Sequence, residues 1–160
     1  EDYGLITAKD YSGERWNEYC VAKGNQAVFA RFYYYKMQYL NALYKQFIEK
    51  MKGLNTVIQC GYGEVGKAWW CFFRCNGVNN IEAVCDNNKS IHGKKISGGI
   101  DLADVESTVR KYPEAHYFIA VGGGFAKQIK EQLIKCGISE VQIVEALIPM
   151  NPHRATTIYE

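Results

Sequence analysis

The sequence lacks the features that would tie it to a membrane or to a nucleic acid. No apolar run approaches the roughly 20 residues that a membrane span needs, and the first residues, "EDYGLITAKDYSGERW", lack the basic start and apolar middle of a signal peptide. The net charge is only +2, so the composition does not call for DNA, RNA or an acidic membrane surface. From these absences we expect a cytoplasmic protein with no membrane span and no nucleic acid partner.

The sequence also lacks a recognisable metal site. Its six cysteines form no C-x-x-C pair, and together with the three histidines they form no cluster with the spacing of a zinc site. Most of them fall inside apolar runs, which predicts free, buried thiols in a reducing compartment. Cys71 and Cys75 lie one helical turn apart and would need a third ligand from elsewhere to hold a metal. The run around them, "AWWCFFRC", favours the core instead. We therefore expect no metal.

Two common hydrolase motifs are absent as well. There is no G-x-S-x-G elbow and no H-E-x-x-H helix, and the three histidines lie far apart in the chain. Tyr19 and Lys23 have the Tyr-x-x-x-Lys spacing of the short-chain dehydrogenase/reductase family, in which Lys lowers the pKa of the Tyr phenol. That family places the pair after several strands, whereas here it precedes the first one. The catalytic residues are therefore unknown from the sequence.

A long helix is predicted before the main domain. Residues 27–51 contain no Gly or Pro, and their apolar residues recur at steps of three and four, as in a helical seam; these are Tyr33, Met37, Leu40, Tyr44, Phe47 and Met51. Gly53 is placed as its C-cap. We expect a helical appendage over residues 1–53 and a single α/β domain over residues 54–160. The first residue is Glu rather than Met, which is consistent with a processed form or a fragment.

Two interpretations of this helix stay open. Its apolar face is wider than a narrow coiled-coil stripe, so it is expected to meet more than one surface. One interpretation is packing against the following domain. The other is a homodimer interface, or a contact with a domain missing from the chain, since tyrosine is favoured at interfaces.

After Asn55 short β-like runs alternate with helical stretches. Strands are expected at 56–60, 81–86, 116–121 and 141–144, and helices at 64–77, 102–111 and 125–137. Strands that alternate with helices at this spacing form βαβ units with a parallel sheet and right-handed crossovers. The predicted fold class is α/β, a doubly wound, mostly parallel sheet that is Rossmann-like, with the long helix as an N-terminal appendage.

A glycine loop joins the first strand to the first helix of this domain. Gly61, Gly63 and Gly66 form G-x-G-x-x-G, and Asp86 ends the next strand 20 residues after Gly66, as in the dinucleotide fingerprint. Gly61 would permit the tight turn, Gly63 the approach of a diphosphate, and Gly66 close packing of the helix. Asp86 would accept hydrogen bonds from ribose and disfavour a 2′-phosphate, so NAD or a nucleoside diphosphate would fit better than NADP.

Two further features bear on the same site. Glu64, on the first turn of the helix, can satisfy the helix dipole itself and would repel a phosphate, while Lys67 partly offsets that charge. A second glycine run, "VGGGF" at 121–125, follows the third strand; it either faces the ligand or only permits a sharp turn. The predicted cofactor-binding residues are Gly61, Tyr62, Gly63, Glu64, Val65, Gly66, Asp86, Asn87, Gly122 and Gly123.

From about Asn55 to Leu147 the sequence resembles a known Rossmann-type module. The carrying stretches are "GYGEVG" at 61–66, Asp86-Asn87 followed by "GKKISGGI" at 93–100, and "QLIKCGI" at 132–138. Similar modules accompany some glycosyltransferases, FkbM-type methyltransferases and sugar acyltransferases of bacterial polysaccharide biosynthesis. The NADH-sensing domain of Rex-type redox repressors has a similar pattern, although their DNA-binding winged helix is absent here.

The resemblance implies that the glycine loop and Asp86 bind a small-molecule nucleotide, with a nucleoside-diphosphate sugar or NAD as the expected ligand. It places the chain in a protein of sugar transfer, such as a transferase of polysaccharide biosynthesis, without supplying a reaction. Two alternatives remain. One is an NAD-dependent reductase or epimerase of a nucleotide sugar that uses Tyr19 and Lys23. The other is a non-catalytic interaction module with a vestigial ligand site.

Overall fold

The structure, a computed structural model, describes residues 26–146 and residue 150, with side chains from residue 39 onward. The chain divides into two compact units, Glu1–Ala42 and Leu43–Glu160. None of the described helices combines the length and the apolar character of a membrane span. The domain boundary between residues 53 and 54 stays a proposal.

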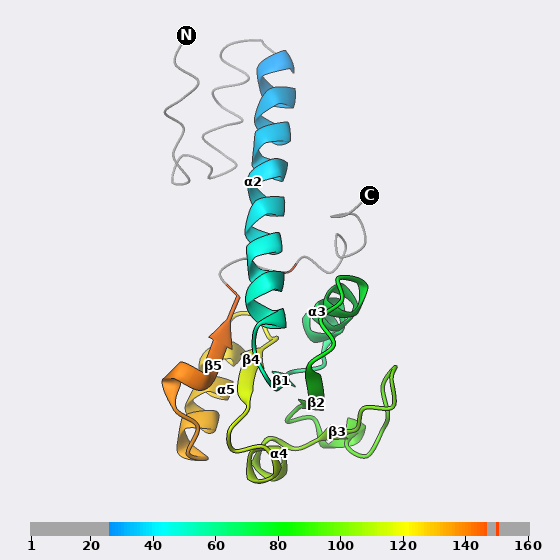
Figure 1. The fold of residues 1–160 in the computed structure, drawn as a ribbon, viewed down its shortest axis with the longest axis vertical. Helices are drawn as coiled ribbons and strands as arrows, with labels where there is room; N and C mark the ends of the chain where they lie inside the picture. Colours follow the sequence, from blue (N-terminus) through cyan, green and yellow to red (C-terminus); the bar gives the residue numbers. More distant parts are fainter. Residues whose placement is uncertain (1–25, 147–149, 151–160) are drawn as a thin grey trace. The chain divides into compact units, whose positions relative to one another are not determined.

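Among the described residues five parallel strands form the sheet, in the order β3-β2-β1-β4-β5. The elements in chain order are α2 (Gln26–Lys52), β1 (Val57–Cys60), α3 (Glu64–Cys75), β2 (Ile81–Cys85), the 3-10 helix η3 (Lys89–Ile91), β3 (Leu102–Ala103), α4 (Val105–Lys111), β4 (His116–Ile119), α5 (Gly124–Lys135), the 3-10 helix η4 (Glu140–Gln142) and β5 (Ile143–Glu145) (Figure 1). The predicted doubly wound, Rossmann-like class is therefore confirmed. Since the strand order reverses between β1 and β4, the loops that follow these two strands meet at one edge of the sheet.

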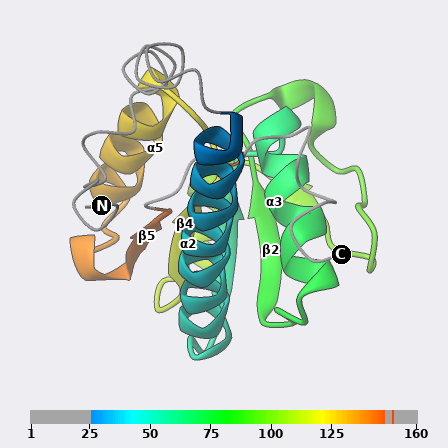
Figure 2. The ribbon, with the colours of Figure 1, turned by 90° about the horizontal axis from the view of Figure 1, so that it is seen from above.

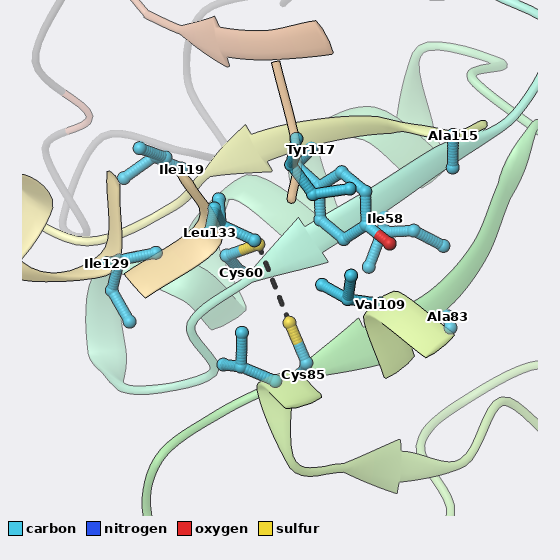
Figure 3. Close-up of a cluster of buried hydrophobic side chains, with 12 residues drawn as sticks. Ile58, Cys60, Ala83, Cys85, Val109, Ala115, Tyr117, Ile119, Ile129 and Leu133 are labelled. Atoms are coloured by element: carbon cyan, nitrogen blue, oxygen red, sulfur yellow. Dashed lines mark hydrogen bonds between the residues drawn. The ribbon is translucent and has the colours of Figure 1, made fainter. Parts of the chain in front are cut away.

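One face of the sheet is covered by α4 and α5. Side chains alternate along a strand, so Ile58 and Cys60 point to this face, where Tyr117 joins them from β4. The helices contribute Val105, Val109, Ile129 and Leu133 to the same buried cluster (Figure 3). Figure 2 shows the strands between α5 on one side and α3 on the other.

An aromatic cluster covers the opposite face. Phe118, fully buried on β4, has its ring centroid 5.2 Å from that of Trp69 and 5.1 Å from that of Phe73, both on α3. The last turns of α2 complete the cluster, since the Phe47 centroid lies 5.6 Å from that of Phe118. Packing against the following domain is therefore observed for this end of the predicted long helix. Side chains up to Gln38 lie outside the described set.

The described cysteines differ in burial, and Cys136 is half-buried. Cys60 and Cys85 are buried, and their two thiols share a hydrogen bond over 3.5 Å (Figure 3). This contact and burial raise the pKa of the Cys60 thiol well above its ordinary value, which keeps it protonated and unreactive. Cys71 and Cys75 are exposed, so the prediction of burial was wrong for them. They lie on the outer face of α3, whose aromatic residues occupy the inner face.

Two predicted elements begin two or more residues later in the structure than expected. The helix expected from Leu102 begins at Val105, because Leu102 and Ala103 pair with β2 and form β3. Asp104 then caps α4, since its carboxylate accepts a hydrogen bond from the Ser107 N–H over 2.8 Å. The last strand begins at Ile143 rather than Val141, which lies in η4 and is 87% exposed. The apolar, β-branched residues around Val141 favour a strand. Backbone pairing with β4, however, begins only at Ile143.

Candidate functional site

The glycine loop after β1 is packed too tightly for side chains at two positions. Gly61 has a φ of +106°, and a Cβ there would collide with the Val121 side chain and lie 3.2 Å from the Ala120 carbonyl oxygen. A Cβ on Gly66 would lie 2.7 Å from the carbonyl carbon of Gly61 and closer still to its oxygen. Glycine thus permits the turn at one position and the close approach of α3 at the other.

Gly63 differs from both of these glycines. Its φ of −70° and ψ of −164° are extended backbone that any residue adopts, and a Cβ there would meet nothing within 4 Å. It is exposed and is the N-cap residue of α3, a position where Ser, Thr, Asp or Asn would serve well. The fold does not require glycine at this position. Because Gly63 has no side chain, the N-terminus of α3 stays accessible.

A buried glutamine in β1 holds the loop in shape. The Gln59 side chain is fully buried, and its Nε2 donates hydrogen bonds to the carbonyl oxygens of Gly61 and Gly66, each over 2.9 Å. Its Oε1 has no hydrogen-bond partner among the described residues. The sequence analysis missed this residue, although one polar residue within the apolar run "VIQC" is a signal that could have found it.

Replacing Gln59 with methionine is expected to destabilise the fold by about 1–3 kcal/mol, because the buried Gly61 carbonyl loses its donor. Chemical denaturation of the purified variant measures this effect. Gln128→Met is the matched control, since Gln128 is exposed on α5 and its replacement is expected to change stability by less than about 0.5 kcal/mol. Equal stability of the two variants would contradict a structural role for Gln59.

Asp86 connects the glycine loop to the end of β2. Its Oδ2 accepts a hydrogen bond from the Tyr62 N–H over 2.6 Å, and its Oδ1 accepts one from the Asn88 N–H over 2.7 Å. The His92 Nε2 lies 2.7 Å from the Asp86 carbonyl oxygen. A carboxylate has about four acceptor positions, so Asp86 can still accept hydrogen bonds from a ligand. The sequence predicted its place but not its hydrogen bonds to the loop.

Charged and polar groups surround the start of α3. Partial burial, with the nearby Cys71 as a lesser cause, raises the pKa of the Tyr62 hydroxyl above its ordinary value. The Lys67 Nζ lies 5.8 Å from the centroid of the Tyr62 ring. Glu64 is exposed, and no described residue donates a hydrogen bond to its carboxylate. The helix N-terminus therefore keeps a negative side chain nearby that no described group engages.

The second glycine run lies beside the first. Gly61 approaches Ala120 and Val121 closely, as described above, and the Ala120 N–H donates to the Cys60 carbonyl over 2.8 Å. Gly123, with a φ of +60°, is the N-cap residue of α5, whose first turn carries no acidic side chain. A Cβ on Gly122 or Gly123 would meet nothing within 4 Å. The N-termini of α3 and α5 therefore lie at the same sheet edge.

Asn87 joins the site to α5 from the β2 side. Its Nδ2 donates a hydrogen bond to the Oε1 of Gln132 over 2.9 Å. All the predicted cofactor-binding residues thus lie at the carboxyl edge of the strands. Tyr19 and Lys23 lie outside the described residues, so the catalytic alternative has no structural account.

A pocket of about 160 Å³ opens at the same edge, between the ends of β4 and β5. Its lining includes Val65 and Trp69 from α3, Val121 and Gly122 from the second glycine run, Ala126 from α5 and Glu145 from β5. Only Val65 and Gly122 were predicted from the sequence. The others were not predicted, because strand order and the packing of α3 and α5 on the sheet bring them together.

Comparison with known proteins supplies no family for this chain. No model of a protein family matches the sequence, and no curated protein matches it significantly. Among solved structures the chain is similar to RSP, a Rex-family repressor, with 19% identity, a TM-score of 0.48, and coverage of 64% of this chain and 49% of that one. It thus spans about half of the repressor's length.

RSP in complex with β-NADH gives 21% identity and a TM-score of 0.44, with 61% of this chain and 48% of that chain covered. RSP in complex with β-NAD+ and operator DNA gives 18% identity and a TM-score of 0.46. The match covers 65% of this chain and 56% of that chain. Since one similar chain was solved with operator DNA, the expectation that nucleic acid is excluded as a partner was wrong. A net charge of +2 averages over the whole chain and does not exclude a local basic surface.

Proposed function

We propose that the carboxyl edge of the sheet binds a nucleotide that carries a diphosphate and a ribose, such as NAD or a nucleoside-diphosphate sugar. The observation that carries this proposal is Gly63. Its conformation suits any residue and its surroundings are empty, so the fold itself gives no reason for glycine there. A glycine that the fold does not need leaves backbone N–H groups open to a ligand.

The diphosphate would lie between the two glycine runs. The helices α3 and α5 are 12 residues long, and each has a glycine as N-cap residue, without a capping side chain. The first N–H groups of a helix lack intrahelical acceptors and carry partial positive charge, so they favour an anion. The carboxylate of Glu64 opposes this binding, while Lys67 and the acid-free first turn of α5 support it.

The ribose would lie beside Asp86. The two carboxylate oxygens of Asp86 each accept one backbone hydrogen bond, and these bonds fix the carboxylate at the edge of the loop. The carboxylate keeps further acceptor positions for hydroxyl groups. Its negative charge disfavours a 2′-phosphate, so NAD is expected to bind more tightly than NADP. A role in sugar transfer or polysaccharide biosynthesis rests on the sequence resemblance and stays a proposal.

The substitution Gly63→Asp tests the proposed site. The new carboxylate would cap α3 and occupy the phosphate position, so binding is expected to weaken on the order of a hundredfold, since like charges in contact cost several kcal/mol. The fold is expected to keep its stability or gain up to about 0.5 kcal/mol, because Asp is a better N-cap than Gly. Thermal melts with NAD, NADP, UDP-sugars and CDP-sugars measure both effects; a ligand at 100 times its Kd adds about 2.7 kcal/mol.

Asn79→Asp is the matched control. Asn79 is exposed in the loop before β2, at the opposite edge of the sheet, and gains the same charge. Its ligand-induced shifts are expected to equal those of the unmodified chain. If none of the nucleotides raises the melting temperature of the unmodified chain, the proposal fails and the interaction-module alternative is favoured.

A further inference from the structure

Residues 93–102 form a small hairpin that leads into β3. At its tip the Ile96 carbonyl accepts a hydrogen bond from the Gly99 N–H over 3.0 Å, which closes a β-turn. Ser97 and Gly98 are the two central residues of this turn, and Gly98 has a φ of +87°. Ser97 is exposed, so a second protein can reach its hydroxyl at the tip of the hairpin.

The residues before Ser97 are basic. Lys94 and Lys95 stand three and two positions before it, and both are exposed. The Lys95 Nζ lies 3.8 Å from an Asp101 oxygen, but an exposed pair of this kind holds the lysine only weakly. Many protein kinases select serines by such a charge pattern, because acidic side chains line their substrate grooves. Ser90 is exposed as well, in η3, but asparagines stand three and two positions before it.

The Ser97 hydroxyl lies beside hydrogen-bond donors of α3. Its Oγ accepts a hydrogen bond from the Trp70 Nε1 over 2.8 Å. The Arg74 Cζ lies 5.7 Å from the centroid of the Trp70 ring, and the Arg74 Nη2 would lie 3.7 Å from a Cβ on Gly98. Arg74 is exposed, and no described carboxylate forms an ion pair with it. A phosphate on Ser97 would therefore meet an indole N–H and a guanidinium.

We propose that Ser97 is phosphorylated by a protein kinase that recognises basic substrates, and that Arg74 and Trp70 then hold the phosphate against α3. The Ser97 Oγ bonds to the γ-phosphorus of ATP, and the bond from that phosphorus to the bridging oxygen breaks, so that ADP leaves. The hydroxyl proton passes to the catalytic aspartate of the kinase. The modification requires no ligand at the glycine loops.

The phosphate changes how the hairpin is held. It brings a charge of about −1.5 to −2 at pH 7 and three acceptor oxygens. A guanidinium binds phosphate through paired, charge-assisted hydrogen bonds, which are stronger than the neutral bond between Trp70 and the Ser97 hydroxyl. Phosphorylation therefore fixes the tip of the hairpin to α3.

The catalytic subunit of cyclic-AMP-dependent protein kinase, which prefers basic residues before serine, tests the site. The full chain is incubated with this kinase and ATP, and mass spectrometry of its peptides follows each serine over time. Ser97 is expected to be phosphorylated at least tenfold faster than Ser90. Lys94→Ala is expected to slow the reaction at Ser97 about tenfold, while Lys127→Ala, an exposed lysine on α5, leaves its rate unchanged. Equal rates at the two serines, or no phosphate on Ser97, overturn the proposal.

The melting temperature of the phosphorylated chain tests the contact with α3. Phosphorylation of Ser97 is expected to raise the Tm by about 2 to 4 °C, because the phosphate gains charge-assisted hydrogen bonds. Arg74→Gln is expected to abolish this rise, and Arg110→Gln, an exposed arginine on α4, is the control that keeps it. A phosphorylated chain that melts no higher than the unmodified chain overturns the proposal, and so does an equal rise in Arg74→Gln.

Discussion

Replacing Gly66 with alanine is expected to destabilise the fold by about 3 kcal/mol, which corresponds to a fall in Tm of about 6 to 12 °C. The added Cβ would lie 2.7 Å from the carbonyl carbon of Gly61. That carbon belongs to a turn that Gln59 holds by hydrogen bonds to Gly61 and Gly66, so the backbone has little freedom to move away. Differential scanning calorimetry of the purified variant measures the fall.

Gly63→Ala is the matched control for this prediction. It adds the same methyl group three residues earlier in the same motif, where nothing lies within 4 Å. It is expected to cost at most about 1 kcal/mol, because alanine is a poorer N-cap than glycine. Equal losses in the two variants would show that glycine is needed throughout the motif for a reason other than the contact between α3 and the turn.

Replacing Phe118 with alanine is expected to cost about 3–5 kcal/mol, the range for loss of a buried aromatic ring. The ring is fully buried and packs against three others, those of Phe47, Trp69 and Phe73. Its removal leaves a cavity among residues of β4, α3 and α2. Because the neighbouring rings also pack against one another, as Phe47 does against Trp69 and Trp69 against Phe73, they cannot collapse fully into the space. Urea denaturation measures the loss.

Phe125→Ala is the control for Phe118→Ala. Phe125 is 67% exposed on the first turn of α5, so the same truncation is expected to change stability by less than about 0.5 kcal/mol. A loss of less than 1 kcal/mol for Phe118→Ala would contradict the aromatic cluster as a main part of the core.

The local pattern of the sequence was sufficient for most elements of the sheet. The strands β1, β2 and β4 and the helices α3 and α5 follow the alternation of apolar runs and helical stretches. The strand β3 was missed because two residues carry too little pattern, and it exists only through pairing with β2. The start of α4 could have been predicted, because Asp104 stands three residues before Ser107, the spacing of an N-cap residue and the N–H that it caps. Cys71 and Cys75 were misplaced because an apolar run does not say which face of a helix is buried.

The sequence by itself determined the parallel α/β class and the tight turn at Gly61 and Gly66, because alternation and glycine spacing are local properties of the chain. It also placed Asp86 at the end of β2. Only the tertiary structure decided that this carboxylate accepts a hydrogen bond from the Tyr62 N–H and that Gln59 supports the turn. It also decided that Val65 and Glu145 line one pocket. These relations depend on β1 lying between β2 and β4, and strand order is set by the packing of the whole domain.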